Sequence, residues 1–284
     1  MTTTKTAVPA AEPLTPDIAD GLPALLSDGW TITWRNLARL RRQPETIIFA
    51  VIQPIMFVLL FTQVYGGSIQ VDGVNYTDYL MAGIFAQTVV FGSTTSGAFM
   101  AQDLKEGIID RFRTLPMSPP AVLIGRTNAD LCLNAISVTI MILAGLLVGW
   151  RFHNGFWPFL AGMGLLLLFS YAFSWVMCLI GMSVRTPESI NNASFIILFP
   201  LSFISNAFVQ ASNLPRVLEV IANWNPISAL VQAARELFGN TGGVPAADTF
   251  PMQHPIGTIL VGSVIMLVIF VPLCVRRFGK ASSR

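Results

Sequence analysis

The fold of this chain is decided by the stretch Trp157–Met182, which has the sequence WPFLAGMGLLLLFSYAFSWVMCLIGM. The stretch contains no Asp, Glu, Lys or Arg, and it exceeds the roughly 20 apolar residues that a helix needs to cross a bilayer. Because the hydrocarbon core offers no water to backbone groups, such a segment must satisfy its hydrogen bonds internally as a helix. The stretch therefore predicts a transmembrane helix.

Five further stretches have the same character and also lack charged residues. They are Ile47–Tyr65, Leu80–Met100, Leu131–Trp150, Ile190–Gln210 and Ile256–Val275. Transmembrane β-strands are shorter, at about 10 residues, and alternate apolar with polar positions, which these uniform runs do not. The sequence predicts an all-α integral membrane protein with six transmembrane helices.

The composition of the whole chain agrees with a membrane protein. Of its 284 residues, 53% are hydrophobic and 11% are charged, against about 25% charged in soluble domains. This composition excludes an ordinary soluble globule, and it excludes global disorder, which requires low hydrophobicity. Residues 1–20 and 279–284 are expected to be tails, the first of them disordered, and the first 45 residues do not resemble a signal peptide.

The basic residues predict how the chain is oriented. Of the 17 Lys and Arg residues, fourteen fall on the side of the termini if six crossings are assumed. Only Arg151, Arg216 and Arg235 fall on the other side. Because short cytoplasmic segments are enriched in Lys and Arg, both termini are expected to be cytoplasmic.

Residues 22–42 are predicted to form an amphipathic helix that lies along the inner membrane surface. Its apolar face carries Leu26, Trp30, Trp34 and Leu37, and its opposite face carries Asp28, Thr31, Arg35, Arg39 and Arg42. Tryptophan on one face and arginine on the other are typical of an interfacial helix. The alternative is an ordinary core helix.

The connection after the second span is the most charged cytoplasmic segment, and it is also amphipathic. Its apolar side carries Leu104, Ile108, Ile109 and Phe112, and its polar side carries Asp103, Glu106, Asp110 and Arg113. Pro116 ends the helical pattern, because proline disfavours helical geometry in the residue before it. From the spacing alone, a surface that docks a partner protein and a solvated loop remain equally open.

The outer segment Ala211–Pro255 is predicted to contain a short helical hairpin. Its first helix would start near Leu214, with Asn213 as its cap. Its second would start at Pro226, where proline is tolerated, with Asn225 as its cap. Gly239 occupies the place of a C-terminal capping glycine. Charged residues prevent a full crossing, so we expect the hairpin to dip into the outer leaflet.

Several kinds of chemistry are absent from the sequence. No phosphate-binding loop of the form GxxxxGK(S/T) occurs, so this chain is predicted not to be an enzyme and to bind no cofactor of its own. Neither the histidines His153 and His254 nor the cysteines Cys132, Cys178 and Cys274 have the spacing of a metal site or a disulfide framework. Asp130 is expected to be an interfacial acid at the end of the third span, paired with Arg126 at i−4.

Two spans carry stripes that could line a route for cargo. The second span contributes Thr88, Phe91, Gly92 and Thr95, and the fifth contributes Phe195, Phe199, Phe203 and Asn206. Aromatic rings with few charges suit an apolar or amphiphilic cargo better than an ion. The alternative for each stripe is packing between helices.

Local motifs resemble a known family, the type-2 ABC exporter permeases of the daunorubicin-resistance branch. The segment from Lys105 through IIDRFRTLPMSP, residues 108–119, resembles the signature loop of that family. RRQPE at 41–45, QPIMF at 53–57, WRFHNG at 150–155 and NPIS at 225–228 are similar to that branch. The resemblance covers about residues 25–278.

The resemblance implies a transmembrane domain over residues 22–278 in a bacterial plasma membrane. It implies a homodimer that works with two copies of a separate ATPase subunit, which binds the ATP and Mg, and that exports a drug, an antibiotic or a lipid. The contacts with the ATPase would come from Arg39, Arg42, Asp103, Lys105, Glu106, Gly107, Asp110, Arg111, Phe112, Arg113 and Pro116. Two other classes remain: a channel or lipid scramblase that needs no ATP, and an integral-membrane enzyme.

Overall fold

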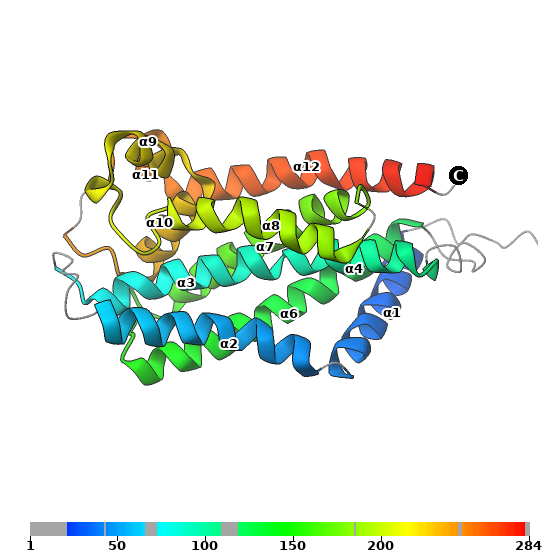
Figure 1. Ribbon diagram of the computed structural model, residues 1–284, viewed down its shortest axis with the longest axis horizontal. Helices are drawn as coiled ribbons and strands as arrows, with labels where there is room; N and C mark the ends of the chain where they lie inside the picture. Colours follow the sequence, from blue (N-terminus) through cyan, green and yellow to red (C-terminus); the bar gives the residue numbers. More distant parts are fainter. Residues whose placement is uncertain are drawn as a thin grey trace, which may run out of the picture.

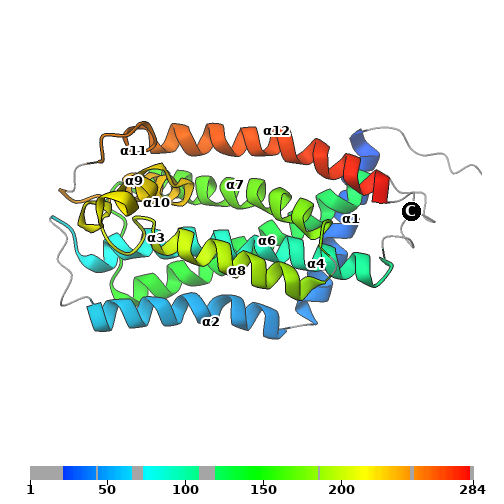
Figure 2. The same cartoon turned by 45° about the horizontal axis from the view of Figure 1, so that its top comes forward.

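The computed structural model describes residues 22–42, 44–65, 73–108, 119–184, 186–243 and 246–281. Most of these residues are helical. The long helices run roughly along one axis, as Figures 1 and 2 show. They are α2 (Pro44–Leu60), continued by a π-helical turn η1 (Phe61–Tyr65), α3 (Tyr76–Gly92), α4 (Thr94–Lys105), α6 (Pro119–Val148), α7 (Phe156–Gly181), α8 (Pro187–Phe203) and α12 (Pro255–Ala281).

Among the described residues, three helical stretches are long and apolar enough to cross a membrane. They are Pro120–Val148, Phe156–Gly181 and Pro255–Gly279, and a shorter apolar stretch covers Val51–Val64. Each of the other predicted spans coincides with helix of a less regular kind: α2 passes into η1, the α3–α4 pair is interrupted at Ser93, and α8 contains Pro200. The all-helical membrane fold is confirmed, and the count of six crossings stays a prediction.

Ser93 interrupts the second predicted span because its side chain bonds outside its own helix. Its hydroxyl lies 3.0 Å from the hydroxyl of Ser170 on α7 and 3.1 Å from the Ser170 carbonyl oxygen. It also donates to the Val89 carbonyl at 2.7 Å, a back-bond that commonly bends helices. The chain therefore reaches the predicted ATPase-contacting segment through a separate helix, α4.

Helix α1 (Leu22–Arg41) lies at one end of the bundle, steeply inclined to the long helices (Figure 1). Its protein-facing side packs on α6, where a Cβ added to Gly125 would lie 2.6 Å from Ile32 and 2.9 Å from the Gly29 carbonyl oxygen. Trp30 and Trp34 point away from the bundle, with 66% and 68% of their surface exposed. The tryptophan face predicted from the sequence is thus left uncovered by the protein.

The outer segment gathers three short helices at the end opposite α1 (Figure 1). They are α9 (Arg216–Trp224), α10 (Pro226–Phe238) and α11 (Phe250–Gln253). As predicted, the Asn225 side chain caps α10 by accepting from the Ile227 amide at 2.9 Å, and Gly239 ends it with a φ of 75°.

The two helices of this hairpin differ in what covers their apolar faces. The face of α10 is buried in the main core, where Phe238 meets Phe85 and Trp150 edge-on. The face of α9 is exposed at Val217, Val220, Ile221 and Trp224. The expectation of two leaflet-facing helices therefore fits α9 and not α10, because α3, α7 and α12 pack around α10.

Arg235 of α10 is buried, with 1% of its surface exposed. Its guanidinium donates to the carbonyl oxygens of Tyr79 at 3.0 Å, Asn206 at 2.8 Å and Ala207 at 3.2 Å. It also lies 3.4 Å from the centroid of the Tyr79 ring. Burial lowers the pKa of Arg235 from its ordinary value. The distribution of basic residues predicts that this arginine lies on the outer side of the membrane. The structure shows that it joins α10 to α3 and to the turn after α8.

Candidate functional site

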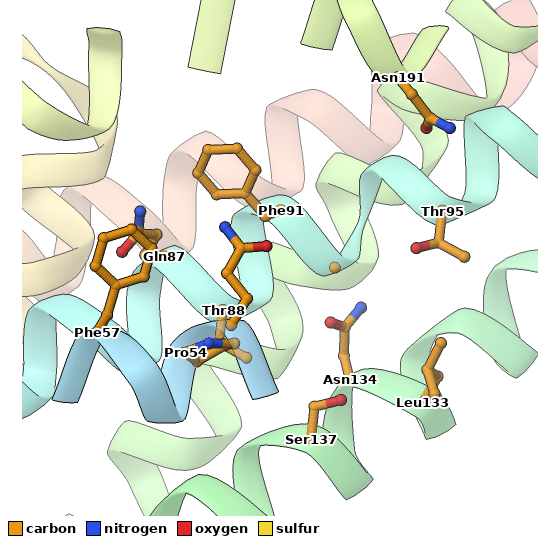
Figure 3. Close-up of a pocket in the computed structure, with 12 residues that line it drawn as sticks. Pro54, Phe57, Gln87, Thr88, Phe91, Thr95, Leu133, Asn134, Ser137 and Asn191 are labelled. Atoms are coloured by element: carbon orange, nitrogen blue, oxygen red, sulfur yellow. The ribbon is translucent and has the colours of Figure 1, made fainter. Parts of the chain in front are cut away.

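A cavity of about 410 Å³ lies inside the bundle between α2, α3, α4, α6 and the start of α8. Figure 3 shows its lining side chains converging from these helices. The lining residues are Gln53, Pro54, Phe57, Gln87, Thr88, Phe91, Gly92, Thr95, Leu133, Asn134, Ser137 and Asn191. Its volume falls in the range typical of small-molecule sites, roughly 300–1,000 Å³.

The cavity wall is built where α6 approaches the junction of α3 and α4. A Cβ added to Gly92 would lie 1.9 Å from the Asn134 side-chain oxygen, so only glycine lets this amide fit. Asn134 has 1% of its surface exposed, and its Nδ2 has no hydrogen-bond partner in the described part of the chain. A buried donor of this kind is costly unless something accepts from it.

The lining combines aromatic rings with neutral polar groups. Phe57 and Phe91 supply rings, four residues supply amides and three supply hydroxyls, and none of the described lining residues is charged. Such a wall can hold an apolar or amphiphilic molecule and hydrogen-bond its uncharged polar atoms. It holds no nucleophile–base pair or metal-binding set, and no group of three potential ligands occurs among the residues searched.

The structure places the four predicted route residues of the second span together. Thr88, Phe91, Gly92 and Thr95 all line this cavity. The cavity is also lined by residues of α2 and α6 that were not predicted from the sequence, Gln53 and Asn134 among them. The available signal was the amide itself, because a polar side chain within a transmembrane segment faces the protein interior more often than lipid.

The predicted route residues of the fifth span lie outside this cavity. Phe195, Phe199 and Phe203 stack along α8, with ring centroids 4.9 and 4.4 Å apart. The ring centroid of Phe208 lies 4.9 Å from that of Phe203, and the centroid of Phe61 lies 4.8 Å from that of Phe208. These five rings form an aromatic ladder.

Phe57 joins this ladder to the cavity. Its ring centroid lies 6.4 Å from that of Phe203 and 6.0 Å from that of Phe61, and the same ring lines the cavity. Part of the ladder is exposed at the protein surface, with Phe195 51% and Phe203 37% exposed. Asn206, the last predicted route residue, lines a separate cavity under α9.

The residues predicted to contact an ATPase are only partly described. Asp103 is buried near the end of α4, and Lys105 and Glu106 are exposed beside Gly107, which has a φ of 66°. Arg42 is exposed, and Arg39 lies on α1. Asp110, Arg111, Phe112, Arg113 and Pro116 lie outside the described residues. The ends of α4 and α12 lie at the same end of the bundle as α1 (Figure 1).

Asp130 is more deeply buried than the sequence suggested. It is 2% exposed, and its carboxylate accepts a hydrogen bond of 2.7 Å from the Ser174 hydroxyl. Arg126, one turn earlier, places its guanidinium 4.0 Å from the Phe99 ring centroid. With Asn134 one turn later, these side chains form a buried polar row on α6 that ends at the cavity. Packing of α4 and α7 on this face of α6 explains why the acid is buried within the protein. Its position at the membrane interface stays a prediction.

Comparison with known proteins gives a consistent result. The model of the ABC-2 type transporter family matches residues 28–238. The chain is 30% identical over 253 residues to the daunorubicin resistance ABC transporter permease protein of Streptomyces coeruleorubidus, covering 89% of this chain and 86% of that protein. It is 25% identical over 232 residues to the doxorubicin resistance ABC transporter permease protein of Mycobacterium tuberculosis, covering 78% and 77%.

Proposed function

Because the chain belongs to the ABC-2 type transporter family and is a membrane permease subunit of an ABC transporter, we propose that it exports a hydrophobic or amphiphilic small molecule. The cargo, a drug, an antibiotic or a lipid, leaves the cytoplasm or the inner leaflet. A separate ATPase subunit supplies the energy, and ATP and Mg bind there. Two copies of this chain assemble with two copies of that subunit.

The observation that carries this proposal is the neutral cavity joined to an aromatic ladder. Phe57 lines the cavity and contacts the ladder at Phe203, so an apolar molecule in the cavity has continuous aromatic contact along α8. Aromatic side chains provide large contact areas and lose little rotamer entropy. The partly exposed rings of Phe195 and Phe203 would face the second copy of the chain, so that two ladders enclose one route.

We propose six crossings with both termini in the cytoplasm. Exposed aromatic side chains support this placement of the membrane. Trp30 and Trp34 lie on α1, Trp157 lies near the start of α7, Trp224 ends α9 and Phe250 begins α11. Helices α9 and α11 are at the end of the bundle opposite α1 (Figure 1). Tryptophan is enriched at both membrane–water interfaces. The α1 end, where α4 ends, is then the cytoplasmic end, and there Arg39, Arg42 and residues 103–116 contact the ATPase.

Cysteine labelling tests this topology. In a background lacking Cys132, Cys178 and Cys274, we expect His153→Cys to react with a membrane-impermeant maleimide in intact cells. Ser118→Cys should react only after the membrane is permeabilised. Labelling of position 118 from outside would show that the orientation is reversed.

Alanine at Phe199 tests the cargo route. The ring of Phe199 stacks between those of Phe195 and Phe203, so its removal breaks the ladder but keeps the helix. We expect Phe199→Ala to change export of at least one substrate severalfold, measured in vesicles that contain the permease and its ATPase, across a panel of aromatic drugs and native lipids.

The matched control is Ile197→Ala, which removes a side chain on the same helix that is 64% exposed and outside the ladder. An ATPase-dead partner subunit separates pumping from leakage. Unchanged export by Phe199→Ala together with altered export by Ile197→Ala would assign the ladder to packing. Transport that persists with the dead ATPase would support an ATP-independent scramblase instead.

A further inference from the structure

A second cavity, of about 330 Å³, lies at the outer-hairpin end of the bundle, under α9 and beside α10 and α11. It shares no lining residue with the 410 Å³ cavity beside Asn134, which is called the cargo cavity below. Its walls come from the start of α3, the turn after α8, the hairpin helices and the segment before α11. The export function proposed above makes no use of it.

The walls of this hairpin cavity carry neutral polar groups with unused hydrogen-bonding capacity. The side-chain oxygen of Asn206 is buried and has no hydrogen-bond partner in the part of the chain that the structure describes. Within those same residues, Gln210, Ser212, Asn223 and Thr241 have no side-chain hydrogen bond either. The lining therefore offers amide and hydroxyl donors and acceptors together.

The two charges of the lining are already engaged. Arg235 donates to three carbonyl oxygens and stacks on Tyr79. Glu219 accepts from Arg216 at 3.0 Å. Since the charges are opposite and each has a partner, the cavity has no excess charge to select an ion. It matches a neutral group that both donates and accepts several hydrogen bonds.

We propose that the hairpin cavity binds a neutral, polyhydroxylated group, the glycosyl part of an amphiphilic molecule. The volume falls within the range of small-ligand sites, and hydroxyl groups are both donors and acceptors, as this lining requires. The inference rests on the proposed function in one respect: it takes the glycosyl group to belong to the cargo on the exit side. Binding itself requires neither ATP nor transport.

The test uses the permease–ATPase complex in nanodiscs without ATP and three fluorescent probes. Methylumbelliferyl glucoside carries a neutral sugar, methylumbelliferyl glucuronide carries an anionic one, and methylumbelliferone carries none. By fluorescence anisotropy, we expect the glucoside to bind about tenfold more tightly than the other two. Equal binding of all three, or tighter binding of the glucuronide, would overturn the proposal.

Variants then locate the site. Asn206→Leu and, separately, Gln210→Leu should remove most of the preference for the glucoside and leave binding of methylumbelliferone unchanged. Gln210 is partly exposed, and its side chain has no hydrogen bond within the described residues, so that variant should fold even if the Asn206 variant does not. Gln63→Leu, an exposed glutamine outside both cavities, should bind like the wild type. A preference that survives Gln210→Leu would place the site elsewhere.

An export assay separates this inference from the proposed function. Vesicles that export methylumbelliferone with ATP, but whose permease shows no preference for the glucoside, would retain the function and reject the glycosyl site. Glucoside that binds and is not exported would assign the cavity to a resident glycolipid rather than to cargo, and would overturn the exit-side part of the proposal.

Discussion

Replacing Arg235 by leucine is expected to destabilise the protein by roughly 3 kcal/mol, because three buried carbonyl oxygens lose a charged donor, although the Asn206 oxygen also accepts from the Tyr79 hydroxyl at 3.2 Å. Those oxygens belong to Tyr79, Asn206 and Ala207, which lie on α3 and in the turn after α8. Each unsatisfied buried polar group costs about 1–3 kcal/mol. Thermal unfolding of the nanodisc-embedded protein measures the effect, and we expect a marked fall in the melting temperature.

The matched control is Arg216→Leu in the same outer segment. Its side chain is 83% exposed and pairs with Glu219 at the surface, and exposed ion pairs contribute about 0–1 kcal/mol. Its melting temperature should stay close to that of the wild type. Arg235→Lys should be intermediate, because an ammonium cannot reproduce the planar fork of donors. Similar melting temperatures for Arg235→Leu and Arg216→Leu would contradict the structural role assigned to Arg235.

Alanine at Gly181 is expected to abolish most cargo-stimulated ATP hydrolysis by the reconstituted transporter. An added Cβ would lie 2.4 Å from the Gly97 carbonyl oxygen and 2.9 Å from the Gly97 Cα, so α4 and α7 would have to separate. A Cβ added to Gly97 would be similarly close, at 2.5 Å from the Met177 carbonyl oxygen. Small residues permit such close helix contact in membranes. Because α4 leads to the segment proposed to contact the ATPase, its displacement should disturb coupling more than insertion.

Gly164→Ala is the control on the same helix, because nothing lies within 4 Å of the added Cβ. Alanine in a helix interior is favoured over glycine by roughly 0.5–1 kcal/mol, so this variant should be at least as stable as the wild type and fully active. Membrane levels, partner binding and ATP hydrolysis should be measured for both. If Gly181→Ala keeps wild-type coupling, the tight crossing of α4 and α7 does not transmit the motion of the ATPase.

Local features of the hairpin were predictable because they depend on neighbours in sequence. Asn225 caps α10, Pro226 opens it and Gly239 ends it, as the capping preferences indicated. The start of α9 was less regular than predicted. A short 3-10 turn, Ala211–Asn213, precedes it, and Pro215 rather than Asn213 occupies its cap position.

Some of the residues that line the candidate site could be predicted from the sequence, and others could not. The stripe of Thr88, Gly92 and Thr95 follows from helical spacing within one span, and all three residues line the cavity. The partners of this stripe on α2 and α6 could not be paired with it, because no local pattern states which helices are neighbours. Their amides, Gln53 and Asn134, are nevertheless visible in the sequence as polar residues within apolar runs.

The sequence by itself determined that this protein is a helical membrane permease of the ABC-2 type. Apolar length forces helix formation in lipid, and the family motifs lie in contiguous segments. Only the tertiary structure decided which faces of those helices meet. Helix α7 is apolar on nearly all sides, so its sequence does not indicate which of its faces packs on which neighbour. Packing between segments distant in the chain produces the burial of Arg235, the contact of Gly97 with Gly181 and the cavity beside Asn134. Close packing depends on the shapes of both surfaces at once, and one stretch of sequence specifies only one of them.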